Sequence, residues 1–341
     1  MTDNSKILFG RDFIVAGGAG YIGSHVCKMI ASYGGNPITF DNLSAGHEHA
    51  VQWGPLINVD LRNREAAKRA FNAHNHVRTV IHLASSIEVG LGEKQPAAFY
   101  DNNVSAALNL LIAMQETEAN RLIFSSSCAT YGETQNMPLV ETEPQLPVSV
   151  YGKTKLAIEH MIQSFHKAHD LNYVTLRYFN ASGADESRLI GEEHDPETHL
   201  IPIALEAAAG RRDAMKIFGA DYDTPDGTCL RDYIHVNDIA LAHIKSEQAF
   251  DAGLKKAEVN IGTGRPISNL DILKTIETIT GRPVPYDNAP RREGDITTLY
   301  ADARKAEEIL SFTPQHSDIE NIIRTAWAFH AQNWGIDEHR Y

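Results

Sequence analysis

The chain has 341 residues, of which 43% are hydrophobic and 22% charged, a composition typical of a soluble globular protein. Its 31 Lys and Arg against 44 Asp and Glu give a formal charge of −13, which argues against a general nucleic-acid-binding surface. No apolar run approaches the roughly 20 residues that cross a bilayer, and the N-terminus lacks signal-peptide organisation, so we expect a cytoplasmic protein without a membrane partner. The three cysteines lack metal-ligand spacing and predict neither a disulfide framework nor a metal site.

After a loose leader over residues 1–11, short apolar runs alternate with helical patterns. Strand and helix in alternation require right-handed crossovers, which predicts an α/β fold with a Rossmann-type, doubly wound parallel sheet. The predicted strands are Asp12–Ala16, Pro37–Asp41, Leu56–Asp60, Thr79–Ala84, Arg121–Ser125 and Tyr173–Tyr178, with helices over Ala97–Glu116 and Gly152–His169.

This alternation breaks in a stretch rich in Gly, Asp, Glu and Pro that runs from about residue 180 to 235. We therefore expect a nucleotide-binding Rossmann domain over residues 12–180, to which the chain returns around residues 230–265. A smaller C-terminal α/β domain over residues 181–341 would mainly bind the substrate. Helices are predicted there near Ile201–Gly210, Asn269–Thr280 and Ile319–Trp334.

A glycine-rich turn separates the first predicted strand from the first helix. Gly17, Gly20 and Gly23 recur every three residues, and such a turn lets a pyrophosphate approach the helix N-terminus. Because any tight βα turn can carry these glycines, Asp41 decides the prediction. It ends the second strand roughly 20 residues later, where a carboxylate binds the ribose hydroxyls and repels a 2′-phosphate, so NAD is favoured over NADP. Asp60–Leu61 follows the third strand and either meets the adenine end or, through Asp60, caps the next helix.

Tyr151 and Lys155 are four positions apart, on one face of a predicted helix. A tyrosine is normally a poor base because its pKa is about 10, but a nearby ammonium favours the phenolate. Tyr151 could then take a proton from a substrate hydroxyl while a nicotinamide takes the hydride. Taken alone, this spacing is more often that of a solvated helix face, so the other motifs must decide.

Three motifs occur together in this chain: Gly17-x-x-Gly20-x-x-Gly23, Phe124-Ser125-Ser126-Ser127 and Tyr151-x-x-x-Lys155. Their combination resembles the extended short-chain dehydrogenase/reductase superfamily. Within it, several segments in order along the chain resemble the UDP-glucose 4-epimerases. These segments are Gly20–His25, Asp41–Leu43, Tyr100–Val104, Leu176–Asn180, Asp226–Thr228, Arg231–Val236 and Pro290–Asp295.

The resemblance implies a tightly bound NAD, a UDP-sugar substrate inverted at C4 through a 4-keto intermediate, and a homodimer that pairs through the helices at 97–116 and 152–169. It also implies three catalytic residues. Tyr151 would remove the proton of the sugar 4-hydroxyl, Ser127 would bond the reacting oxygen, and Lys155 would bond the nicotinamide ribose. The implied NAD-binding positions are Gly17, Gly20, Tyr21, Ile22, Gly23, Asp41, Asn42, Leu43, Asp60, Leu61, Leu83, Ala84, Ser85, Asn102, Lys155 and Tyr178.

The C-terminal segments imply a site for the uridine diphosphate. Arg231 and Arg292 are candidates for its phosphates, since a guanidinium fork matches phosphate oxygens, although either could be a surface ion-pair partner. Phe218 would flank the uracil or, equally, pack in the core. The complete set of implied substrate positions is Ser127, Tyr151, Asn180, His199, Leu200, Lys216, Phe218, Arg231, Arg292, Asp295 and Leu299.

Four positions depart from the pattern of the resembling family. Ile87 replaces a lysine near the nicotinamide, Ala129 a threonine, and His199 a frequent asparagine. Leu299 replaces an aromatic residue that closes the pocket beside the sugar C2 substituent. Because leucine is smaller, we hypothesise partial activity on UDP-N-acetylglucosamine.

Three other functions stay open. A UDP-pentose 4-epimerase, acting on UDP-xylose and UDP-arabinose, fits because nothing in the chain demands the C6 hydroxymethyl group. A nucleotide-sugar 4,6-dehydratase would carry Asp-Glu shortly after the active-site serine, and Cys128-Ala129 there count against it. A catalytically inactive NAD-binding regulator would usually lose the Tyr–Lys pair, which this chain keeps.

Overall fold

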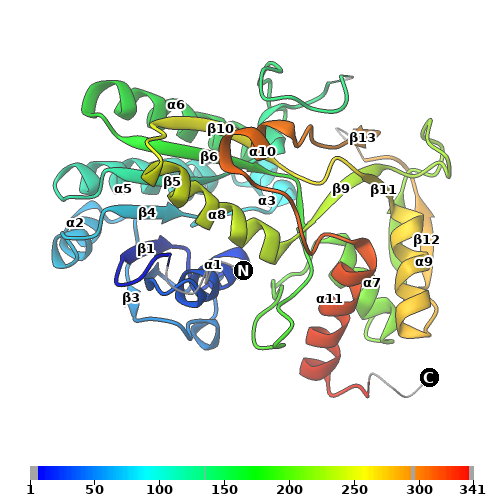
Figure 1. The fold of residues 1–341 in the computed structure, drawn as a ribbon. Coiled ribbons are helices and arrows are strands. Elements are labelled where there is room, and N and C mark those ends of the chain that lie inside the picture. Colours follow the sequence, from blue (N-terminus) through cyan, green and yellow to red (C-terminus); the bar gives the residue numbers. More distant parts are fainter. Residues whose placement is uncertain (1–6, 135, 293–295, 338–341) are drawn as a thin grey trace.

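The computed structural model describes residues 7–134, 136–292 and 296–337, and its centre is a seven-stranded sheet (Figure 1). All neighbouring strands are parallel, in the order β10-β6-β5-β4-β1-β2-β3. This is the order of a doubly wound dinucleotide-binding sheet, so the predicted fold class is confirmed. The strands are β1 Asp12–Ala16, β2 Asn36–Asp41, β3 Leu56–Asn58, β4 Thr79–His82, β5 Arg121–Ser127, β6 Asn172–Tyr178 and β10 Lys256–Ile261.

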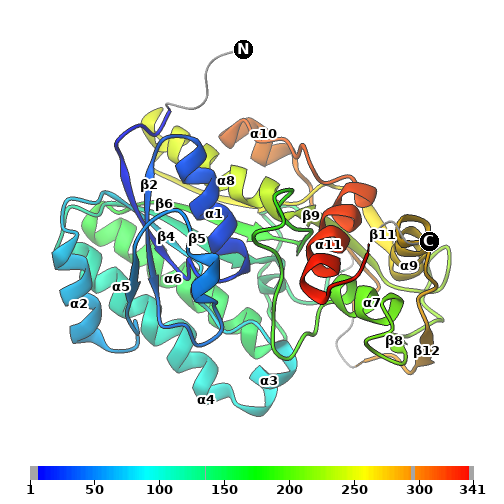
Figure 2. The same cartoon turned by 90° about the horizontal axis from the view of Figure 1, so that it is seen from below.

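Helices cover both faces of this sheet, because successive side chains of a buried strand point to opposite sides. In β1, Val15 packs into a core cluster with α1, α8 and α10, whereas Ile14 packs into a second cluster with α2, α5 and α6. Figure 2 shows α1 and α8 on the face opposite α5 and α6. These helices are α1 Tyr21–Ser32, α2 Arg64–Ala73, α5 Ala106–Gln115, α6 Val150–His169, α8 Val236–Asp251 and α10 Arg304–Leu310.

A smaller group of elements lies beside the C-terminal ends of the parallel strands (Figure 1). Strand β9 pairs with β7, β11 and β13, and β8 pairs with β12. Helices α7, α9 and α11 pack together in a third core cluster. The bounds are β7 Asn180–Ser182, α7 Leu200–Ala208, β8 Met215–Phe218, β9 Leu230–His235, β11 Pro266–Ser268, α9 Asn269–Thr280, β12 Tyr286–Ala289, β13 Thr298–Leu299 and α11 Ile319–Trp334.

Two segments differ from the sequence-based expectation. The helix expected over 97–116 runs without a break from Pro96 to Gln115, but its middle is a six-residue π-helical turn, η3 (Tyr100–Ser105), between α4 (Pro96–Phe99) and α5. Residues 7–11, expected in a loose leader, are anchored in part: Leu8 is fully buried in the cluster of α1 and Arg11 pairs with Asp251 at 2.6 Å, whereas Phe9 is exposed. The remaining short helices are η2 Glu48–Ala50, α3 Val89–Lys94 and η4 Cys128–Thr130. Among all the described residues, no helix combines the length and apolarity needed to cross a membrane.

Candidate active site

Tyr151 and Lys155 occupy the first turns of α6, where Ser149 caps the helix by accepting the Gly152 N–H at 3.1 Å. Lys155 is only 2% exposed, and its Nζ donates to the Ser125 carbonyl oxygen at 2.8 Å. The same Nζ lies 5.7 Å from the centroid of the Tyr151 ring. The ammonium is therefore held between the end of β5 and the tyrosine, as one-turn spacing on a helix permits.

Ser127 ends β5 beside this helix. Its Oγ accepts the Ala129 N–H at 3.1 Å, the kind of backbone contact expected of a serine at a strand end. The same side chain is near enough to Tyr151 to lower the pKa of that tyrosine. The structure brings Tyr151, Lys155 and Ser127 together, and their catalytic roles stay predictions.

The electrostatics of the pair differ from the simple expectation that the lysine lowers the tyrosine pKa. Burial raises the pKa of Tyr151 to about 12, although the neighbouring Ser127 side chain opposes the shift. Burial also lowers the pKa of Lys155 to about 7, although the charge of Glu159 opposes that shift. A half-deprotonated lysine stabilises a phenolate weakly near neutral pH. A bound positive charge beside Tyr151 would lower the tyrosine pKa.

Buried polar residues behind this pair were not singled out from the sequence. Glu159, one turn beyond Lys155, pairs with Arg177 of β6 at 2.7 Å, and both side chains are almost fully buried. Ser126 donates to the same carboxylate. A glutamate at the i+4 position from the lysine was the available clue, because it shares the buried face of α6.

The turn between β1 and α1 contains three predicted cofactor-binding glycines, and a different constraint acts at each position. Gly17 has φ +87°, and a Cβ on it would lie 2.5 Å from the Ala84 nitrogen. A Cβ on Gly23 would lie 2.0 Å from the Gly17 oxygen. A Cβ on Gly20 would meet nothing closer than 3.5 Å, so protein packing does not require this glycine. Gly20 precedes α1, whose first turn carries no acidic residue, which fits an anion such as a pyrophosphate at the helix N-terminus.

Asp41 lies at the C-terminal end of β2, against this turn. Its Oδ2 accepts the Ala19 N–H at 3.0 Å and its Oδ1 accepts the Leu43 N–H at 2.9 Å. The carboxylate that would bind a ribose is thereby oriented by the glycine turn itself. These contacts fit the dinucleotide site predicted from Gly17 to Asp41.

Asp60 does not cap the next helix, so that interpretation was wrong. Asn63 is the N-cap of α2 and accepts the Ala66 N–H at 3.0 Å. Asp60 instead pairs with Arg62 at 2.7 Å, and this hydrogen-bonded partner lowers the pKa of the Asp60 carboxyl. Leu61 beside it is buried in the second core cluster.

The segment after β4 lies against the glycine turn. Leu83 and Ala84 both donate their N–H groups to the Ala16 oxygen, at 2.8 and 2.9 Å. Asn102 in η3 donates to the Ser86 Oγ at 2.9 Å. The structure thus gathers these predicted cofactor positions around the C-terminal ends of β1 and β4, where a doubly wound sheet binds its ligand.

Asn103 is a residue that sequence reasoning missed. Its Oδ1 accepts the Ser86 N–H at 2.7 Å, and its Nδ2 donates to the Thr154 Oγ1 at 3.0 Å. It is fully buried and links the segment after β4 to α6, between Tyr151 and Lys155. The π-helical turn that carries it is itself a feature frequent at functional sites.

The other predicted cofactor positions have defined contacts. The Tyr21 hydroxyl donates to the Gly183 oxygen at 2.6 Å, and the Tyr178 hydroxyl is hydrogen-bonded to His243 at 2.8 Å. Burial raises the pKa of Tyr178. Ile22 packs against the first core cluster. The Ser85 hydroxyl donates to the Ser86 oxygen. The Asn42 Oδ1 accepts the Ser44 N–H.

On the substrate side, the guanidinium of Arg292 stacks on the Phe218 ring, 4.7 Å from its centroid. Phe218 and Lys216 share one face of β8, whereas Met215 and Ile217 point into the third core cluster. The contact with Arg292 and the partial exposure of Phe218 therefore separate it from the core. Asp295 lies outside the described residues.

Arg231 of β9 is the cross-strand partner of Leu299 of β13. Leu299 packs against a small cluster that includes Cys128 and Phe179, which places it beside the segment that follows Ser127. Asn180 begins β7 and pairs with Tyr233 of β9. The strand β9 thus connects three predicted substrate positions.

His199 and Leu200 lie at the start of α7. The His199 Nδ1 is 2.9 Å from the Glu192 Oε1 and 3.0 Å from the Glu197 Oε1. Burial opposes protonation, but these carboxylates raise the pKa of His199 to about 10. The side chain is thus engaged with two carboxylates of its own loop.

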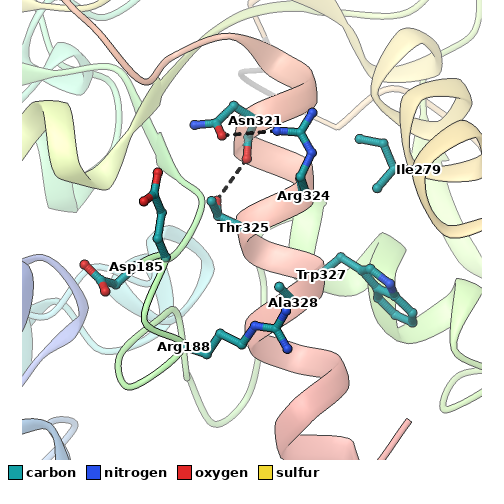
Figure 3. Close-up of a pocket in the computed structure, with 9 residues that line it drawn as sticks. Asp185, Arg188, Ile279, Asn321, Arg324, Thr325, Trp327 and Ala328 are labelled. Carbon is teal, nitrogen blue, oxygen red and sulfur yellow. Dashed lines mark hydrogen bonds between the residues drawn. The ribbon is translucent and has the colours of Figure 1, made fainter. Parts of the chain in front are cut away.

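A cavity of about 590 Å³ lies elsewhere, between α11 and the segment that follows β7 (Figure 3). None of the predicted site residues lines it. Its walls include Asp185, Arg188, Arg324 and Trp327, which Figure 3 shows around α11. This cavity therefore does not mark the site at Tyr151.

Comparisons with known proteins agree with this geometry. The model of the NAD dependent epimerase/dehydratase family matches residues 13–262. A UDP-glucose 4-epimerase of Rhizobium leguminosarum bv. trifolii is 45% identical, over 95% of this chain and 98% of that protein. Among solved structures, UDP-glucose 4-epimerase from Brucella ovis in complex with NAD has a TM-score of 0.91 at 46% identity, over 94% of this chain and 98% of its own. The enzyme from Bifidobacterium longum in complex with NAD+ and UDP has a TM-score of 0.89 at 34% identity, over 94% and 98%. The resemblance inferred from the motifs is confirmed: the chain belongs to the NAD-dependent epimerase/dehydratase family.

Proposed function

We propose that the chain catalyses the NAD-dependent inversion of C4 in a UDP-sugar and interconverts UDP-galactose and UDP-glucose. The observation that carries this proposal is the convergence of Tyr151, Lys155 and Ser127 at the end of β5, next to the glycine turn of β1. The relatives reported above are UDP-glucose 4-epimerases over nearly the whole chain.

The chemistry divides between the cofactor and the protein. Bound NAD supplies a reversible oxidant for C4. Tyr151 accepts the proton of the sugar 4-hydroxyl and returns it once the 4-keto sugar has presented its other face. Ser127 would bond the reacting oxygen, and Lys155 would hold the nicotinamide ribose. With the positively charged, oxidised form of the cofactor bound, the burial that raises the Tyr151 pKa would be offset.

Binding of the nucleotide is proposed for the elements around β8 and β9. Arg231 and Arg292 would hold the diphosphate, and Phe218, on which Arg292 stacks, would flank the uracil. Asn180, Leu200 and Lys216 would complete this side of the site. A domain division near residue 180 follows from the same proposal, with the NAD site in residues 12–180 and most UDP-sugar contacts in residues 181–341.

A second substrate, UDP-N-acetylglucosamine, is favoured by Leu299. This leucine is only partly buried and packs beside Cys128 and Phe179, near the segment that follows Ser127. A leucine leaves more space at this wall than an aromatic ring would, which suits a bulkier substituent at C2.

We also propose a cytoplasmic homodimer. Tyr100 of η3 is 41% exposed and Leu108 of α5 is 39% exposed, so apolar side chains stand on the surface next to α6. A second copy packing along α5 and α6 would bury them.

The direct test is to incubate the purified protein with UDP-galactose, without added NAD, and to follow the sugar anomeric signals by proton NMR. Appearance of UDP-glucose without net reduced nicotinamide supports the proposal. Absence of conversion, with or without added NAD, contradicts the hexose assignment, and UDP-pentoses would be assayed next.

A further inference from the structure

Four ligand-bearing side chains converge in the segment between β7 and α7, outside the site described around Tyr151. They are Glu192, His194, Glu197 and His199, and one ligand atom from each lies within 4.8 Å of every other. Glu192 is only 5% exposed. We name this set the Glu–His cluster.

The spacing of these atoms is close to that of ligands around a single metal ion. The His194 Nδ1 lies 3.4 Å from Glu192 and 3.6 Å from Glu197, and the His199 Nδ1 lies 2.9 and 3.0 Å from the same two carboxylates. Ligands that bind zinc at about 2.0–2.2 Å with tetrahedral angles are about 3.3–3.6 Å apart. The two distances from His194 fall at that value, whereas the two from His199 are shorter. The two histidines face different oxygens of Glu197, so a bound ion requires small shifts of His199 and Glu197.

The orientation of the two histidines adds a second observation. Both Nδ1 atoms face the same oxygen, Oε1 of Glu192. Yet the buried His194 Nδ1 makes no hydrogen bond to any described residue, although two carboxylates face it. An imidazolium there would donate a hydrogen bond, whereas a nitrogen that shares a cation with the carboxylates needs none.

Charge balance is compatible with a metal ion. Two largely buried carboxylates require two compensating positive charges, because unpaired buried charge is costly. One divalent ion between neutral imidazoles supplies them, and so would two imidazolium rings without a metal, which is the alternative that the experiments below test. Glu197 is already fixed, because its Oε1 accepts the N–H groups of Thr198 at 2.7 Å and His199 at 2.8 Å.

We propose that Glu192, His194, Glu197 and His199 bind one divalent transition-metal ion, for which zinc is the best match. Nitrogen and carboxylate ligands in a closed set of four favour zinc in a structural role. From the sequence we expected no metal site, and a metal ion at the Glu–His cluster departs from that expectation. The assignment gives His199 a role other than the substrate contact predicted for it.

The metal would stabilise the chain between the two halves of the molecule. His199 directly precedes α7, which begins at Leu200, and the His194 ring lies edge-on to Tyr21 of α1 at 6.4 Å. Tyr21 in turn donates to the Gly183 oxygen. Loss of the ion would therefore loosen the segment that joins α1 to α7.

The first experiment measures metal in the wild-type chain. The protein is loaded with zinc, freed of excess by gel filtration, and analysed by inductively coupled plasma mass spectrometry. We expect about one zinc per chain, removal by dipicolinate with a fall in Tm, and recovery of the Tm on adding zinc. Failure to retain zinc, Co²⁺ or Mn²⁺ after loading overturns the proposal and leaves a set of ion pairs.

Variants then assign the ligands. His194→Ala and Glu197→Gln should each weaken zinc binding at least about tenfold, since even changes beyond the ligands cost roughly that much. His49→Ala is the matched control. His49 is an exposed histidine that pairs with Glu193 next to the Glu–His cluster, so the variant protein should bind zinc as the wild type does. Co²⁺ bound to wild type should show the intense visible bands of a tetrahedral ion. Equal zinc binding by wild type and Glu197→Gln contradicts the ligand set even if His194→Ala fails to fold. These readouts do not depend on epimerase activity.

Discussion

Gly152 and Ala129 are packed so closely that a Cβ on Gly152 would lie 2.4 Å from the Ala129 carbonyl oxygen. The N-terminus of α6 therefore lies in close contact with the turn that follows Ser127. The distance between Tyr151 and Ser127 therefore depends on a residue that takes no part in the chemistry. Gly152 acts as a positioning residue for both.

Gly152→Ala should lower kcat by about tenfold or more, because a displacement near 1 Å in a reacting site can cost about a hundredfold. Overpacking should also destabilise the fold by about 1–3 kcal/mol. Steady-state kinetics and urea unfolding measure the two effects. Gly90→Ala is the control, since a Cβ on Gly90 meets no atom within 4 Å. Unchanged kcat in a folded Gly152→Ala protein would refute this role.

Gly20 and Gly23 should separate cofactor binding from folding. A Cβ on Gly20 meets no protein atom closer than 3.5 Å but enters the space proposed for the pyrophosphate. We therefore expect Gly20→Ala to retain less NAD after purification, and to match the Tm of the wild type once NAD has been removed from both proteins. Gly23→Ala clashes with the Gly17 oxygen and should lower the Tm itself. NAD content is measured in the perchloric acid extract. Wild-type NAD content in Gly20→Ala would argue against the proposed phosphate position.

Lys155 should make stability depend on pH. Its pKa is lowered to about 7 in the folded protein, below the ordinary value of 10.5, so the unfolded chain binds the extra proton between those values. The free energy of unfolding should therefore rise with pH from 7 to about 9.5, by up to about 1.4 kcal/mol per pH unit from this group. In Lys155→Met this contribution disappears. Urea unfolding of both proteins across that range gives the difference, and parallel pH profiles would show that the lysine is not perturbed.

Leu299 should govern tolerance of an N-acetyl group. Leu299→Tyr is expected to reduce kcat/KM for UDP-N-acetylglucosamine by at least about tenfold relative to UDP-glucose, since loss of pocket space is worth about 1–3 kcal/mol. Leu299→Met, of similar volume, is the control. If wild type turns over UDP-glucose well but UDP-N-acetylglucosamine undetectably, the hypothesis fails.

Motifs with local causes were the most predictable from the sequence. The α9 and α11 helices run over the predicted ranges, because each has an N-cap side chain before it and a glycine after it. The grouping of Gly17, Asp41 and Ala84 followed from the rule that parallel strands end at a common edge. The family resemblance supplied the predicted substrate residues, which local patterns do not encode.

Features that depend on long-range packing were not predictable. Asn103 acts through Ser86 and Thr154, which are distant in sequence, and nothing in its neighbours distinguishes it from a helical asparagine. The sequence allowed two equally weighted interpretations of Asp60, a contact with the adenine end or a helix cap. Only the structure shows that Asn63 is the cap. The Glu–His cluster escaped notice because its spacing, Glu-x-His-x-x-Glu-x-His, becomes a site only when the loop folds back on itself.

The measurement that tests the central claim most directly uses UDP-galactose labelled with deuterium at C4, incubated with the wild-type protein in ordinary water. If C4 is oxidised and reduced by one bound cofactor while Tyr151 moves only the hydroxyl proton, the UDP-glucose formed must keep its deuterium at C4. NMR and mass spectrometry of the UDP-glucose measure the deuterium that remains at C4. Tyr151→Phe should form product at least about a hundredfold more slowly, because general base catalysis contributes about 10²–10⁴-fold. UDP-glucose that has exchanged its C4 deuterium with solvent would contradict the mechanism.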